Sequence, residues 1–224
     1  MPAELQTERQ GGTLVLTIRD PGASPVLPEQ VFTAGVEALS VAESDPDVRC
    51  IVLRGGGTHS CAESTLPLWA DTPAATVDAR RPVRDFAEAL RVIPKPVIAG
   101  VEGMACGDSF WLAMACDLVV AAADAKFLPF PARPGVERGD TGFPLETLPR
   151  LSRHVWLEWM WLAEPLTAQQ LQRLGLVNQV AGSGQAFEQA LAWADRLAQG
   201  SAQALADTKE YAQRLESGAL PPAP

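Results

Sequence analysis

The sequence is poor in the residues that build metal and redox sites. Its 224 residues include two histidines, His59 and His154, and no H-E-x-x-H motif, which excludes a histidine-rich metal centre. The four cysteines form no C-x-x-C pair, so a zinc ribbon or a redox dithiol is not expected. Cys50 and Cys116 stand inside apolar runs, where a small core residue is the expected role.

Common nucleotide and hydrolase motifs are also missing. The run Gly55-Gly56-Gly57 follows an apolar segment, but it completes no G-x-G-x-x-G, and no Gly-Lys-Ser/Thr occurs in the chain. A dinucleotide site and a nucleoside triphosphate site of the P-loop kind are therefore disfavoured. The absence of a G-x-S-x-G elbow argues in the same way against a serine hydrolase of that type.

Basic residues are outnumbered and long apolar runs are absent. The 18 Lys and Arg against 27 Asp and Glu give a formal net charge of −9, which argues against nucleic acid and against an anionic membrane surface as partners. No apolar stretch approaches the ~20 residues of a membrane span. The opening MPAELQTERQGG is charged and contains no apolar core, unlike a signal peptide. We therefore expect a cytoplasmic protein that binds no membrane.

What the sequence does contain is an alternation of buried strands and amphipathic helices. The hydrophobic fraction of 47% is ordinary for a globular chain. Such alternation predicts an α/β fold with right-handed crossovers and a mostly parallel sheet, which binds ligands at the carboxyl ends of its strands. Apolar runs predict strands at 13–18, 48–53, 96–101, 118–122 and 177–180, and helical spacing predicts helices at 28–44, 77–92, 110–115, 187–197 and 202–215.

Two turns rich in small residues directly follow predicted strands. The first spans residues 57–64, and the second, residues 103–109, leads into a predicted helix. Small residues allow close approach of a ligand to the backbone, and a helix start offers N–H donors. On neighbouring strands the two turns could direct two N–H groups at one carbonyl oxygen, as in an oxyanion hole. As a pattern alone, two glycine turns also fit plain connections.

From about Thr13 to Val180 the chain resembles the crotonase superfamily, the enoyl-CoA hydratase/isomerase family. The segment from Ile93 to Asp117, IPKPVIAGVEGMACGDSFWLAMACD, carries the most specific part of the resemblance. The other matching segments follow in the order and spacing of the family: VRCIVLRGGG from Val48, HSCA from His59, AKF from Ala125, PRLSR from Pro149, and LTAQQL and GLVN from Leu166 and Gly175.

The resemblance implies a crotonase (ClpP-like) ββα spiral core with C-terminal helices, and a coenzyme A thioester as ligand. It also implies a homotrimer or hexamer. By alignment with the family, Ser64 and Asp108 supply the two oxyanion N–H groups, and Ala62 supplies a carbonyl to the adenine amino group. Coenzyme A would enter as part of the substrate, with no separate cofactor.

The sequence departs from the hydratase pattern at the positions that carry protons. Trp111 and Pro131 align with the two catalytic glutamates of hydratases, and neither side chain exchanges protons at neutral pH. Glu63 and Asp108 replace glycines in the two oxyanion turns, where a carboxylate would repel a developing negative charge. Trp111 could alternatively fill the volume left by the glutamate and the acyl chain.

Asp140 is the best remaining candidate for a catalytic carboxylate, and Glu137 is the second. They lie in GVERGDTG, which resembles, with one extra residue, the G-[LI]-x-x-D loop of dienoyl-CoA isomerases and aroyl-CoA dehalogenases. The alternative is that both are solvated charges beside Arg133 and Arg138.

These observations predict a spiral core over residues 1–182 and a shortened helical segment over 183–224. Full-length members of the family continue with further helices, so the pocket would be open or closed by a neighbouring subunit. The tryptophans at 156, 159 and 161 suit a core or a subunit interface, with the interface preferred. The expected function is acyl-CoA binding with isomerisation or another enolate reaction in place of hydration. A catalytically inactive acyl-CoA-binding or assembly subunit is the alternative, and a hydratase with rearranged acids is the weakest.

Overall fold

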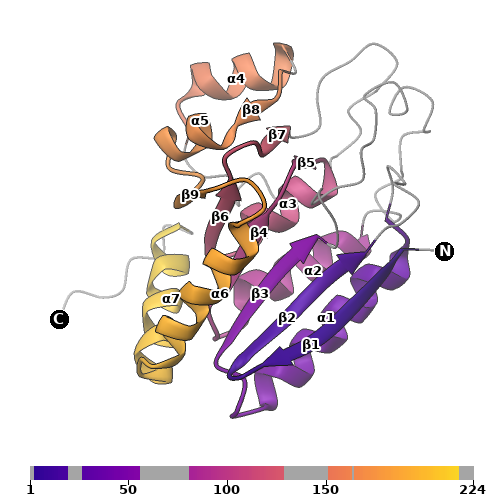
Figure 1. Ribbon diagram of the computed structural model, residues 1–224, viewed down its shortest axis with the longest axis vertical. Helices are drawn as coiled ribbons and strands as arrows, with labels where there is room; N and C mark the ends of the chain where they lie inside the picture. Colours follow the sequence, from indigo (N-terminus) through magenta and orange to yellow (C-terminus); the bar gives the residue numbers. More distant parts are fainter. Residues whose placement is uncertain (1–2, 20–26, 56–80, 129–150, 163, 217–224) are drawn as a thin grey trace.

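The computed structural model describes residues 3–19, 27–55, 81–128, 151–162 and 164–216, and these form two sheets wrapped by helices (Figure 1). The strands are β1 (Glu4–Gln10), β2 (Thr13–Arg19), β3 (Cys50–Gly55), β4 (Val97–Val101), β5 (Met104–Cys106), β6 (Leu118–Ala122), β7 (Lys126–Leu128), β8 (Leu166–Thr167) and β9 (Gln179–Ala181). The helices are α1 (Glu29–Ser44), α2 (Arg81–Val92), α3 (Asp108–Ala115), α4 (Arg153–Leu162), α5 (Ala168–Arg173), α6 (Ala186–Ala198) and α7 (Ala202–Glu216).

The large sheet has the strand order β1-β2-β3-β4-β6-β9, and the small sheet has the order β5-β7-β8. In the large sheet only β1 is antiparallel to its neighbour. The chain passes from one sheet to the other in successive turns, β4 to β5 and then β6 to β7. This alternation between two sheets is the predicted α/β spiral core.

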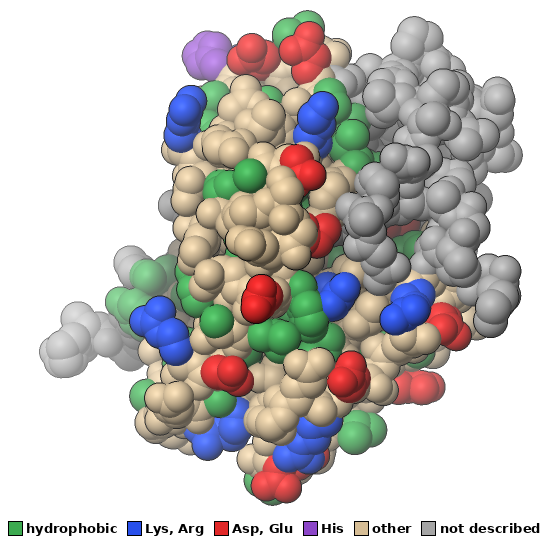
Figure 2. Space-filling model, viewed as in Figure 1, with side chains coloured by type: hydrophobic (Ala, Val, Ile, Leu, Met, Phe, Trp, Pro, Cys, Tyr) green, Lys and Arg blue, Asp and Glu red, His purple; other side chains and the backbone are tan. Residues whose placement is uncertain are grey.

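The central strands are buried because helices cover both faces of the large sheet. In Figure 1, α1 and α2 lie behind β1–β3, and α6 crosses in front. Every residue of β4, and four of the five in β6, is buried, as expected for parallel strands covered on both sides. On the face shown in Figure 2, acidic and basic side chains are interspersed around an apolar patch over the α6 and β1–β3 region.

The charged N-terminal segment forms a strand, β1, which the sequence analysis did not predict. Its residues are mostly exposed, so it lacks the apolar run from which a strand is predicted. It is held by its antiparallel pairing with β2, from Glu4 opposite Arg19 to Gln10 opposite Thr13. Charged side chains on such an edge strand also discourage pairing with other chains.

Two strands, β3 and β9, begin two residues later than predicted, because the first predicted residue of each forms a turn hydrogen bond. β3 begins at Cys50 because the Val48 N–H donates to the Asp45 carbonyl in the turn after α1. β9 begins at Gln179 because the Val177 N–H donates to the Leu171 carbonyl near the end of α5. The other predicted strands and helices are found within two residues, apart from residues 77–80, which lie outside the described residues.

Candidate functional site

The two strands that precede the small-residue segments are adjacent and parallel in the large sheet. β3 and β4 pair in parallel from Ile51 opposite Val97 to Arg54 opposite Gly100. Their carboxyl ends therefore meet at one edge of the large sheet, which is where α/β folds bind ligands. The first small-residue segment, residues 57–64, lies outside the described residues, and the second begins at Gly103.

The second turn is built by two glycines in the left-handed region. Gly103 has φ 67° and Gly107 has φ 55°, and the short strand β5 lies between them. The Lys126 N–H donates to the Gly103 carbonyl at 2.9 Å, and the Gly107 N–H donates to the Leu128 carbonyl at 3.1 Å. Both ends of the turn are thereby attached to β7. A Cβ is disfavoured at these φ values, which explains the glycines.

Asp108 is the first residue of α3 and is half-buried. The helical hydrogen bonding starts when the Trp111 N–H donates to the Gly107 carbonyl at 3.1 Å. The N–H groups of a first helical turn have no carbonyl four residues back and form the positive end of the helix dipole. The Asp108 N–H therefore lies at the start of α3.

Trp111 lies one turn further along α3 and is 3% exposed. Its ring meets the Phe110 ring edge to face, with centroids 5.2 Å apart. Phe110 in turn meets Trp159 of α4 at 5.4 Å and 88°. The position that the family resemblance aligns with a glutamate of hydratases is thus a buried indole packed against Phe110.

Ser109 is a further residue at this edge, which the sequence analysis did not single out. Together with Leu112 and Ala113 it faces a cavity of about 30 Å³ between α3 and the strands. Gly55 and Ala99 line the same cavity. A space of this size holds about one water molecule. The signal that could have identified Ser109 is its i, i+3, i+4 spacing with the two apolar residues.

The remaining predicted site residues lie outside the described residues. These are Ala62, Ser64, Pro131, Glu137 and Asp140. Of the predicted site, the structure describes the α3 end, with Asp108 and Trp111 on successive turns of one helix.

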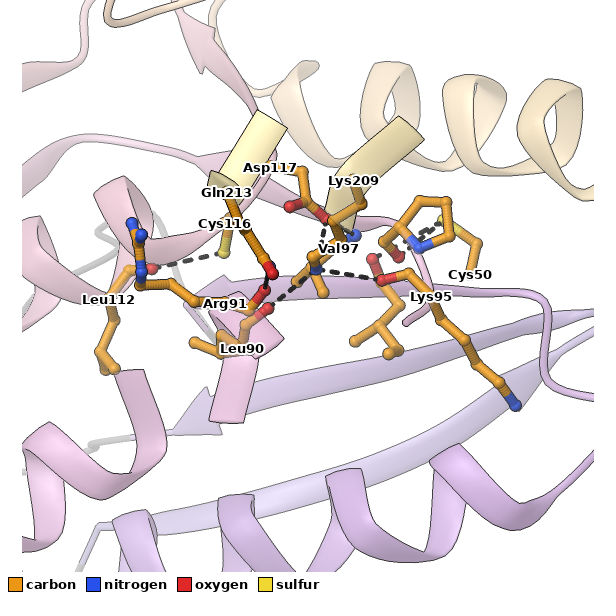
Figure 3. A network of polar contacts seen from close by, with 12 residues as sticks. Cys50, Leu90, Arg91, Lys95, Val97, Leu112, Cys116, Asp117, Lys209 and Gln213 are labelled. Carbon is orange, nitrogen blue, oxygen red and sulfur yellow. Dashed lines mark hydrogen bonds and ion pairs between the residues drawn. The ribbon is translucent and has the colours of Figure 1, made fainter. Parts of the chain in front are cut away.

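A separate polar cluster lies at the opposite, amino-terminal edge of the sheet (Figure 3). Lys209 of α7 donates to Asp117 Oδ2 at 2.7 Å and to the Leu90 and Lys95 carbonyls at 3.1 and 3.3 Å. The same Asp117 oxygen accepts the Val97 N–H at 2.8 Å. Burial raises the pKa of the Asp117 carboxyl in spite of Lys209. All three ammonium protons have acceptors, so this cluster holds α7 against the sheet.

Among the described residues there is neither a metal-binding cluster nor a helix suited to span a membrane. Within residues 3–19, 27–55, 81–128, 151–162 and 164–216, no group of His, Cys, Asp or Glu side chains is arranged to hold a metal ion. No helix in these same ranges is long and apolar enough to cross a bilayer.

The fold and the site define a class of protein: a two-sheet α/β spiral. At the carboxyl edge of its large sheet, a turn with two positive-φ glycines leads into a helix N-terminus. The family model for enoyl-CoA hydratase/isomerase matches residues 8–221. The chain therefore belongs to the enoyl-CoA hydratase/isomerase family, in the crotonase superfamily, and its predicted membership is confirmed.

Individual relatives are similar over most of the chain. The 2,3-dehydroadipyl-CoA hydratase of Escherichia coli K12 is 31% identical over 219 residues, covering 97% of this chain and 85% of the relative. The mevalonyl-coenzyme A hydratase SIDH of Beauveria bassiana is 32% identical over 203 residues, covering 84% and 71%. The solved structure of an enoyl-CoA hydratase from Polaromonas sp. JS666 superimposes with a TM-score of 0.80 at 33% identity, covering 96% and 84%.

Proposed function

We propose that this protein binds a coenzyme A thioester and catalyses isomerisation or another enolate reaction, without standard hydration. The N–H groups of Ser64 and Asp108 hold the thioester oxygen while negative charge develops on it, and Asp140 or Glu137 moves the proton at the α-carbon. Coenzyme A enters with the substrate, and the chemistry requires no further cofactor. We place the reaction in the cytoplasm.

The observation that carries this proposal is Trp111. It is buried against Phe110 at the position where the family's hydratases hold a catalytic glutamate. An indole N–H neither gives up nor takes up a proton at neutral pH, so paired-acid hydration lacks one of its acids here. Pro131 removes the second acid in the same way. Both named relatives are hydratases of CoA thioesters, which supports the thioester as the substrate class.

Asp108 favours the second candidate, a catalytically inactive acyl-CoA-binding or assembly subunit. Its carboxylate belongs to the same residue as one proposed oxyanion donor, and Glu63 precedes the other in the sequence. A carboxylate close to an oxyanion raises its energy, by an amount that depends on how well water screens the pair.

Deuterium exchange at the α-carbon of a saturated acyl-CoA distinguishes the two candidates. An enolate-forming enzyme catalyses this exchange in D₂O whatever its final reaction, and NMR measures it. An inactive binder gives a calorimetric binding signal with no exchange. Rapid loss of the enoyl absorbance of crotonyl-CoA would contradict the proposal, because it would demonstrate ordinary hydration.

The role of Asp140 is tested within the same assay. Asp140→Asn keeps the side-chain volume and removes the proton acceptor, so exchange should slow about 10²-fold or more with little change in acyl-CoA affinity. Asp124→Asn, at an exposed turn residue, is the matched control and should leave exchange unchanged. Equal rates in the two variants would exclude Asp140 and leave Glu137 as the candidate.

A further inference from the structure

The carboxylate of Glu102 joins the end of β4 to the start of α6. Oε1 accepts the Ala186 N–H at 2.7 Å and the Phe187 N–H at 3.4 Å, and Oε2 accepts the Gly184 N–H at 3.1 Å. The N-cap residue of α6, Gln185, makes no side-chain cap of its own. Glu102 therefore caps this helix from 84 residues away along the chain. A carboxylate at a helix start is favoured by charge-assisted bonds and by the helix dipole.

The first turn of α6 is also in contact with the ends of both strands that lead to the proposed site. A Cβ on Gly100 of β4 would lie 3.3 Å from Phe187 Cα, so the helix packs directly on the strand backbone. The Arg54 guanidinium carbon lies 3.9 Å from the centre of the Phe187 ring, a cation–π contact. Arg54 and Gly100 are register partners across β3 and β4. The α6 start thus lies over the last paired residues of both strands.

Glu102 occupies the position from which the oxyanion turn departs. It follows β4 and directly precedes Gly103, whose φ of 67° starts the turn that ends at Asp108. The Glu102 carboxylate accepts three N–H groups at the start of α6. These hydrogen bonds fix the direction in which the chain leaves β4. A displacement of about 1 Å at a reacting group can cost about 10²-fold in rate.

We propose that Glu102 is a positioning residue, which sets the place of the Asp108 N–H by anchoring the exit of β4 to the start of α6. The inference rests on the proposed function, because it assigns a catalytic consequence to the turn. The cation–π contact between Arg54 and Phe187 attaches the end of β3 to the same start of α6. Glu102 itself does not touch substrate in this proposal and transfers no proton.

The test is Glu102→Gln, which retains one oxygen acceptor and the side-chain length but loses the charge and the second acceptor oxygen. The matched control is Glu188→Gln, which removes an exposed carboxylate from the first turn of the same helix. In the α-carbon exchange assay, kcat of Glu102→Gln should fall about 10–100-fold while KM changes less than about threefold. The kcat of Glu102→Asp should also stay below that of the wild type, because the shorter side chain cannot reach all three N–H groups.

Hydrogen–deuterium exchange of the backbone separates failure of this inference from failure of the proposed function. If the wild type catalyses no α-carbon exchange, the proposed function fails, and the inference is then decided by the amides of residues 103–111. These amides should exchange faster in Glu102→Gln than in Glu188→Gln when both are folded. Unchanged amide exchange, or an unchanged kcat in an active enzyme, would overturn the positioning role and leave Glu102 as a helix cap that contributes only stability.

Discussion

At the scale of single residues, the proposal of a non-hydratase reaction rests on the buried Trp111. Its ring is 3% exposed and packs edge to face on Phe110. Trp111→Ala should lower the free energy of unfolding by about 3–5 kcal/mol, because a large cavity remains. Tyr211→Ala, at an aromatic position of α7 that is 51% exposed, should cost about 0.5 kcal/mol or less. Urea unfolding of both variants measures the difference, and equal losses would contradict the buried role of Trp111.

Cys50 is a second residue whose burial has a measurable effect, through pH. Its thiol lies in the core, where Sγ donates to the Pro96 carbonyl at 3.3 Å. Burial raises the pKa of the thiol from 9.0 to about 12. An unfolded thiol ionises at a lower pH than the folded one, so its contribution to stability is complete below pH 9 and is lost between pH 9 and 12.

The corresponding prediction concerns the slope of stability against pH. The free energy of unfolding should decrease from pH 9 upward, and Cys50→Ala should show a shallower decrease than the wild type over pH 9–11. Denaturant unfolding at a series of pH values gives both slopes. Parallel slopes would mean that Cys50 ionises alike in the folded and unfolded chains.

At the scale of elements, α7 is attached to the strand side by the ion pair of Lys209 with Asp117. The Lys209 side chain is 9% exposed and that of Asp117 is 28% exposed. Lys209→Met removes the ammonium donor from two carbonyls and from the Asp117 carboxylate, which keeps only the Val97 N–H, so we expect a loss of about 2–3 kcal/mol. Arg214→Met in the same helix breaks an exposed pair with Glu210 and should cost about 0.5 kcal/mol or less.

Thermal and urea unfolding of the two α7 variants compare the pairs under one condition. Asp117→Asn is a useful third variant, because an amide oxygen can still accept the Val97 N–H. If Lys209→Met and Arg214→Met lose the same stability, the contacts of Lys209 do not hold α7 in place.

The elements that the sequence predicts are those with a one-sided or continuous apolar pattern. The runs at Val97–Val101 and Leu118–Ala122 are buried on both faces, so their composition alone identifies them. β1 escapes prediction because its stability comes from backbone pairing with β2. Glu102 escapes because its partners lie 82 to 85 residues away, and no local pattern encodes such a contact.

The candidate site is likewise predictable only where it follows from local sequence patterns or from the family resemblance. The strands and the helix at 110–115 follow from apolar runs and helical spacing, and the family resemblance assigns roles to Asp108 and Trp111. The charge and geometry around them depend on tertiary packing: Arg54 against Phe187 and Glu102 against α6 join distant segments. The roles of Ser64, Asp140 and Glu137 remain predictions from the resemblance.

At the scale of the whole molecule, α4 presents large apolar side chains at the surface. Trp161 and Leu162 are 62% and 64% exposed. A neighbouring groove of about 290 Å³ is lined by Val155, Leu162 and Leu174 together with Glu158 and Arg173. An exposed tryptophan beside an apolar groove with a charged rim is typical of a protein interface, and the family resemblance predicts that the partner is another copy of this chain.

We therefore expect trimers or hexamers at micromolar concentration, with α4 in the contact between copies. Trp161→Ser should shift sedimentation toward smaller species, because truncation of a central tryptophan costs an interface about 2 kcal/mol or more. Val41→Ser on α1, at a residue 71% exposed, removes a comparable exposed apolar group away from α4 and should leave the assembly intact. A monomeric wild type would contradict the oligomer itself. An oligomer unaffected by Trp161→Ser would move the contact to another surface, and the exposed tryptophan would then need a different partner.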